Sequence, residues 1–239
     1  MIIHKNIQTY FLFLILSLSL FSCISNETMV EAMNVAKLKR IKTDYSHVNS
    51  EQEKRITIES HNILGIDSLP SVKEIKSQIF PFLLVNYWDF QYESKIGYSN
   101  ISENLQYNMK EAILEYNFKT DSLRKLNQNK LTIVIDSIKS NVPYVNKGFC
   151  VFMLLGYSMY NRDLFKPTEL SITLSYKIEK NGIIKSGTFT KTENIALKKN
   201  VLLSSKHFVY DYNDDYLIEL NKLLKKACNE VSDQLLNTE

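Results

Sequence analysis

The chain of 239 residues is poor in the residue types on which many active sites depend. It has six glycines, four prolines, three cysteines and one tryptophan. Phosphate-binding loops need closely spaced glycines, because the backbone must approach the phosphate without side chains in the way. No such loop is present in the sequence, which argues against nucleotide binding.

Histidine is also scarce, with His47, His61 and His207 the only ones beyond the N-terminal segment. They form no HExxH pattern and no close cluster with cysteines or acids, so no zinc site is indicated. An Asp-x-Asn-x-Asp run begins at Asp211, but Tyr216 stands where a calcium loop needs glycine. We therefore predict no metal, no cofactor and no catalytic motif.

Charge of one sign is not concentrated anywhere in the sequence. The formal net charge is +3 and the pI is about 8.5, with lysines and glutamates interspersed. A nucleic-acid-binding domain has a focused basic patch and a pI above about 9. We therefore predict no nucleic-acid partner, while an apolar content of 44% is enough for a folded core.

The N-terminal segment has an apolar run at residues 10–21, broken only by two serines. A membrane-spanning helix needs about 20 residues, whereas the apolar part of an export signal has about 7–15. Leu20-Phe21-Ser22-Cys23 follows and resembles the lipobox of bacterial lipoproteins, although Phe21 departs from the small or aliphatic residue common there. An ordinary cleaved signal or an uncleaved anchor is the alternative.

The lipobox resemblance implies that residues 1–22 are a signal peptide and that Cys23 becomes the acylated first residue. Several acyl chains anchor a protein stably, where one chain is marginal. Ile24 in place of aspartate favours the outer membrane over the inner one. We expect residues 23–54 to be a polar spacer and residues 55–239 to be a single domain.

Hydrophobic periodicity predicts the elements of that domain. Residues 170–178 alternate between apolar and polar side chains, and Asn181-Gly182 favours a type I′ turn into a second strand at 183–192. The continuous apolar runs 80–90 and 149–157 read as buried strands, the latter central. Apolar residues at intervals of three and four predict helices at 102–116 and 214–236. The remaining short apolar runs predict strands at 56–63, 131–138 and 206–210.

This order of elements predicts an α+β fold, with helices packed on one face of a mainly antiparallel sheet and a long helix at the C-terminus. Cys150 on the central strand and Cys228 on the last helix could form a disulfide, although two separate buried thiols are the favoured alternative.

In its topology alone, the domain resembles envelope lipoproteins that serve in assembly: auxiliary lipoproteins of ABC-type transport systems, the curli-export lipoprotein and penicillin-binding-protein activators. No motif of these families is present. We therefore expect a lipid-anchored envelope protein with a non-catalytic binding or assembly role and an envelope protein as partner. The alternative is an envelope hydrolase whose site is assembled from distant residues such as Asp136, Asp163 or His207.

Overall fold

The computed structural model describes residues 26–35, 38–40, 54–59, 71–82, 84–95, 102–120, 129–153, 156–200 and 204–236. The helices in these ranges are α2 (Asn26–Val35), α4 (Ser102–Lys119) and α6 (Ser205–Leu236). The strands are β1 (Ile56–Glu59), β2 (Ser71–Phe82), β3 (Val85–Lys95), β4 (Lys130–Ser140), β5 (Val142–Met153), β6 (Gly156–Phe165), β7 (Thr168–Lys180), β8 (Ile183–Ile195) and β9 (Lys198–Asn200). The predicted α+β class with a long C-terminal helix is confirmed.

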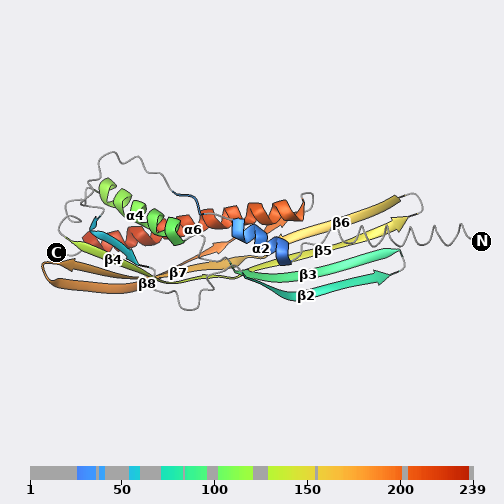
Figure 1. The fold of residues 1–239 in the computed structure, drawn as a ribbon, viewed down its shortest axis with the longest axis horizontal. Coiled ribbons are helices and arrows are strands. Elements are labelled where there is room, and N and C mark those ends of the chain that lie inside the picture. The colour runs from blue at the N-terminus through green and yellow to red at the C-terminus, as the bar shows by residue number, and fades with distance from the viewer. Residues whose placement is uncertain are drawn as a thin grey trace, which may run out of the picture.

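The strands divide into two sheets, which the sequence did not indicate. The first sheet has the order β1-β4-β7-β8 and the second has the order β2-β3-β5-β6-β9. All pairs are antiparallel except β1 with β4. Only Asn141 separates β4 from β5, and Lys166 and Pro167 separate β6 from β7, so the chain passes almost directly from one sheet into the other. The fold is therefore long, with the hairpins of the second sheet projecting beyond the helices (Figure 1).

The hairpin of β7 and β8 confirms the alternation seen in the sequence. Asn181 and Gly182 have φ angles of 50° and 83°, as a type I′ turn requires. Leu170, Ile172 and Leu174 of β7 are buried. This face is covered by α6, which contacts both β7 and β8.

The two continuous apolar runs are not single buried strands, so this part of the prediction was wrong, although β5, which begins the second run, is the middle strand of its sheet. Residues 80–90 contain the end of β2, the turn near Leu84 and the start of β3. Residues 149–157 likewise contain the end of β5 and the start of β6. Each run is a hairpin whose far end is exposed, and Phe82 is 72% exposed. The prediction took the lack of charged residues in these runs as a sign that the whole run is buried.

The C-terminal helix begins earlier than its apolar spacing suggested. Residues 206–210 belong to α6 and not to a strand, because Phe208, Val209 and Tyr212 continue the buried stripe of the helix toward its N-terminus. Ring stacking supports this extension: the Phe165 and Tyr212 centroids lie 3.6 Å apart at 11°. As a result α6 contacts strands of both sheets.

Part of the expected spacer is packed within the domain. Helix α2 buries Met29, Ala32 and Met33 in the common core, and it contacts α6 and β2. Leu38 is also fully buried. Residues 26–35 and Leu38, which the sequence assigned to a polar spacer, therefore pack within the domain. No helix of the described residues is both long enough and apolar enough to span a membrane.

Candidate functional site

The cysteines singled out in the sequence differ in what the structure says of them. Cys23 lies outside the described residues. Cys150 and Cys228 are free, buried thiols, so the disulfide left open by the sequence is not formed. Complete burial raises the pKa of the Cys228 thiol to about 12. Such a thiol is inert, as expected for a cysteine that acts as a small apolar side chain.

The residues named for a hydrolase site are not brought together. Asp136 is exposed on the first sheet, where it accepts a hydrogen bond from Ser175. His207 is exposed on the first turn of α6, whereas Asp163 is completely buried. His47 and His61 lie outside the described residues. Within the described part of the chain, no three His, Cys, Asp or Glu side chains are grouped as metal ligands.

Asp163 is the centre of a buried polar network at the junction of β6, β9 and α6. Its Oδ1 accepts hydrogen bonds from Tyr144 Oη and Asn146 Nδ2, each at 2.6 Å. Its Oδ2 accepts from Ser205 Oγ at 2.8 Å and from Asn200 Nδ2 at 3.1 Å. Four neutral donors thus replace the water that a carboxylate loses on burial.

This network is organised to hold the fold together. Burial raises the pKa of Tyr144 well above its ordinary value, and the adjacent Asp163 charge raises it further, so the phenol stays a donor. Ser205 is the first residue of α6, and Asn200 closes the short strand β9. The carboxylate has no route to a substrate because it is fully covered. Its role is therefore to fix the start of α6 against the second sheet.

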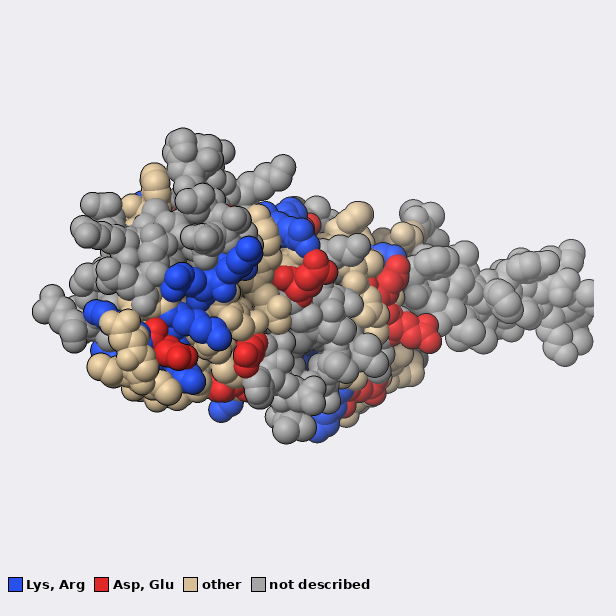
Figure 2. Space-filling model, turned by 60° about the vertical axis from the view of Figure 1, so that its left-hand side comes forward, with Lys and Arg blue, Asp and Glu red and all other residues tan. Residues whose placement is uncertain are grey.

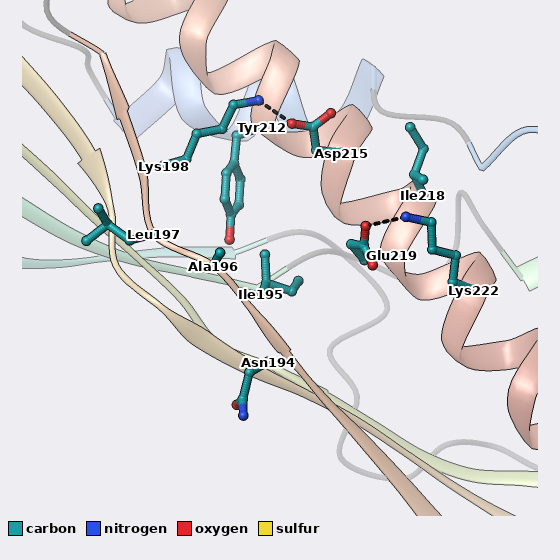
Figure 3. A pocket seen from close by; sticks show the side chains of 10 residues that line it. All are labelled: Asn194, Ile195, Ala196, Leu197, Lys198, Tyr212, Asp215, Ile218, Glu219 and Lys222. Atoms are coloured by element: carbon teal, nitrogen blue, oxygen red, sulfur yellow. Dashed lines mark hydrogen bonds and ion pairs between the residues drawn. The ribbon is translucent and has the colours of Figure 1, made fainter.

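An open pocket of about 550 Å³ lies between α6 and the segment that joins β8 to β9. Figure 3 shows Tyr212 reaching from α6 toward this segment, with ion pairs of Lys198 with Asp215 and of Lys222 with Glu219 beside it. Burial, with the Asp215 charge, raises the pKa of Tyr212 above its ordinary value. The pocket thus contains a protonated phenol and neutralised charges, and none of these groups is an activated nucleophile or base.

Ten of the 17 large apolar side chains that are exposed among the described residues lie at the ends of the β2–β3 and β5–β6 hairpins. We call this surface the hairpin end. Its exposed side chains come from all four strands and from the first turn: Ile79, Phe80, Phe82, Leu84, Tyr87, Phe149, Met153, Tyr157, Met159 and Tyr160. Large contiguous apolar patches of this kind mark binding surfaces on soluble folds.

An aromatic row crosses the hairpin end on the face turned away from α6. Strand pairing places Phe80 beside Tyr87, Tyr87 beside Phe149, and Phe149 beside Tyr160. All four side chains are between 36% and 51% exposed. The rings of Phe149 and Tyr160 stack with their centroids 5.6 Å apart. Paired residues share one face of a sheet, so these rings form a continuous stripe.

A charged row lies directly beside the aromatic row. Its members Asp89, Lys147 and Arg162 are paired in register across β3, β5 and β6. Asp89 Oδ2 lies 2.5 Å from Lys76 Nζ and 3.1 Å from Lys147 Nζ. Burial alone would raise the pKa of Asp89, but the hydrogen bonds from Lys76, Gln91 and Lys147 outweigh it and lower the pKa below its ordinary value.

Beyond the charged row, the four strands carry no charge at all. Residues 77–88 and 148–161 contain no Asp, Glu, Lys, Arg or His. The polar boundary therefore runs straight across β3, β5 and β6, while on β2 the last charged residue is Lys76. This signal was visible in the sequence, because both runs are charge-free and of similar length. The register that aligns them could not be read from the sequence.

The opposite end of the molecule is different. In Figure 2, where the left-hand end of Figure 1 comes forward, basic and acidic side chains lie next to each other. Helix α6 also carries ion pairs: Lys225 binds Glu115 at 2.7 Å, and Lys226 pairs with Glu193.

Comparison of the whole chain with known proteins found no matching family model, no matching curated protein and no matching solved structure.

Proposed function

We propose that this protein is a lipid-anchored envelope lipoprotein of the outer membrane, acting as a non-catalytic binding module whose binding surface is the hairpin end. The single observation that carries the proposal is the exposure of ten large apolar side chains on two adjacent hairpins, where no described element covers them. Lipid attachment at Cys23 is proposed from the lipobox resemblance. It would confine this surface to the neighbourhood of a membrane.

The faces of the hairpins suit this role better than the edge of the sheet. Strand β2 is the outer strand of the second sheet and pairs only with β3 among the described strands. Its edge is interrupted by Pro81, which has no N–H, and by a bulge between Glu74 and Lys76. Natural sheets use these features to prevent strand addition. The aromatic row has no such interruption.

The tether is tested by the Cys23→Ala variant in growing cells supplied with a labelled fatty acid. The wild-type chain takes up the label and stays in the membrane fraction, whereas the variant takes up none and leaves that fraction. Cys150→Ala is the matched control, because its thiol is buried and its loss should not change labelling. Unchanged labelling of the Cys23 variant contradicts the proposed anchor.

The binding surface is tested by a photo-crosslinking residue at Phe80, compared with one at Thr190 on the first sheet. Both are on exposed strand surfaces, but only Phe80 belongs to the aromatic row. The proposal expects crosslinks to envelope components from position 80 and none from position 190. Equal yields from the two positions would argue that the hairpin end is not a binding surface.

A further inference from the structure

Along the strands of the second sheet, charged side chains give way to uncharged ones at one row of paired residues. Asp89 on β3, Lys147 on β5 and Arg162 on β6 are neighbours in register. The aromatic row lies two residues further along each strand, and only uncharged residues follow up to the turns. A partner protein needs no straight boundary across three strands. A lipid bilayer does, because its headgroup layer is flat.

From this boundary we propose that the hairpin end docks on the surface of a lipid bilayer, with the aromatic row among the headgroups and with Phe82 and Met153, near the ends of the two hairpins, in the outermost acyl region. This inference deepens the proposed function and rests on it for bringing the chain to a membrane. Tyrosine and tryptophan favour membrane interfaces because their rings are apolar and carry one polar group. Tyr87 and Tyr160 have this character in the row, and they are 42% and 41% exposed.

The reach of the turns fits shallow insertion. Phe82 lies two residues beyond Phe80, and Met153 lies four residues beyond Phe149. At about 3.3 Å per residue, Phe82 and Met153 lie about 7–13 Å past the aromatic row. An interfacial segment penetrates about 5–10 Å, and the hydrocarbon layer is about 30 Å thick. The hairpins therefore enter one leaflet only.

The strand edges also limit the depth. Among the described residues, β9 pairs with β6 only at residues 163–165, so residues 156–162 of β6 have β5 as their one partner strand. The backbone groups on the outer edge would be unsatisfied in hydrocarbon. At the interface they keep water and headgroups as partners. The interruptions in β2 disfavour a second copy of the chain as the occupant, because they break the ladder that such a copy would extend.

The start of the described chain lies toward the same side. Helix α2 begins at Asn26, and its first, darker blue turn is the end nearer the hairpin turns (Figure 1). Cys23 precedes Asn26 by three residues, so an acyl group there is held within roughly 10 Å of backbone reach from Asn26. A tether at this point would bring the hairpin end toward the bilayer and turn the first sheet away from it.

An environment-sensitive fluorophore tests this proposal in the full chain. Phe82→Cys and Ile183→Cys are matched labelling sites, because both residues are 72% exposed and both lie at hairpin turns, at opposite ends of the molecule. The labelled chains are reconstituted with vesicles of phosphatidylethanolamine and phosphatidylglycerol. The unsubstituted chain, whose Cys150 and Cys228 are buried, measures background labelling.

The expected result is a several-fold rise and a blue shift of emission from position 82, quenched by bromine atoms on the acyl chains, with no change at position 183. Adding Phe80→Glu and Tyr160→Glu to the Phe82→Cys chain should remove the response. Vesicle flotation is measured in parallel. Flotation with an unchanged signal at position 82 would overturn lipid docking and leave the anchor standing. A response that needs no vesicles and grows with protein concentration would also overturn it, in favour of a second copy.

Discussion

The two sheets are built from the same kind of antiparallel strands and run almost directly into each other, yet their faces turned away from the helices have opposite chemistry. The first sheet displays hydroxyl groups: Thr173 Oγ1 and Thr190 Oγ1 lie 2.9 Å apart, and Ser175 Oγ and Thr188 Oγ1 lie 3.0 Å apart. The second sheet displays the aromatic row. Exposure to water alone would not favour hydroxyl groups on one of these outer faces and aromatic rings on the other.

The difference separates two functions of the fold. The first sheet has an inner face buried against α6 and an outer face exposed to solvent, which is the usual arrangement for an antiparallel sheet. The second sheet has the same arrangement only up to its charged row. Beyond that row both faces expose apolar side chains, as with Phe80 on one face and Met159 on the other. Trp88, Cys150 and Phe152 stay buried beyond the row, so the core continues into the hairpins on the face toward α6. The exposed apolar side chains around them form the surface available for binding.

The largest expected loss of stability comes from a substitution that disrupts the junction between the two sheets. Asp163→Ala removes the shared acceptor of four hydrogen bonds at a buried site, and we expect a loss of about 3 kcal/mol in the free energy of unfolding. Chemical denaturation followed by circular dichroism measures it. Asp136→Ala is the control on the first sheet, where an exposed site predicts a change within about 0.5 kcal/mol. Equal losses would mean that the buried network does not hold the junction.

The next effect concerns the base of the hairpin end. A Cβ atom added at Gly148 would lie 2.2 Å from the Trp88 ring and 2.3 Å from the backbone oxygen of Tyr160. Gly148→Ala should therefore cost about 2 kcal/mol through overpacking. Gly156→Ala is the matched control on the same hairpin, because nothing lies within 4 Å of the added atom. Thermal melting of both variants compares them, and similar melting temperatures would contradict close packing at Trp88.

The sequence predicted the first sheet better than the second for a physical reason. Strands with one solvent-exposed face alternate between apolar and polar residues. For this reason β7, β8 and their Asn181-Gly182 turn could be predicted from the sequence. The hairpin end has apolar residues on both faces of the sheet. Its sequence therefore does not alternate, and it has the continuous apolar pattern expected of a buried strand. The Asp163 network could not be predicted either, because its donors come from β5, β9 and α6. Only the folded register brings Asn146, Asn200 and Ser205 to one carboxylate.

A smaller effect depends on pH and tests the charged row. Because the pKa of Asp89 is lowered in the folded state, its ionised form stabilises the fold above the ordinary pKa of 3.8. That contribution is lost as the pH falls through the lowered value. Asp89→Asn should cost about 1 kcal/mol at neutral pH, and this difference should vanish in acid. Denaturation of both proteins across this range measures it, and a cost independent of pH would show that charge is not the cause.

The smallest expected change in stability is also the sharpest test of the comparison. Phe80 is 51% exposed on the second sheet, and Ile184 is 57% exposed near the turn of the first. Phe80→Glu and Ile184→Glu should each change the free energy of unfolding by no more than about 0.5 kcal/mol, because neither side chain is part of the core. Their surfaces should nevertheless respond differently to an apolar fluorescent dye. Only Phe80 lies in a continuous aromatic row, so Phe80→Glu should lower dye binding while Ile184→Glu leaves it nearly unchanged. Equal dye binding by the two variants would mean that the aromatic row is no more a binding surface than an isolated exposed side chain.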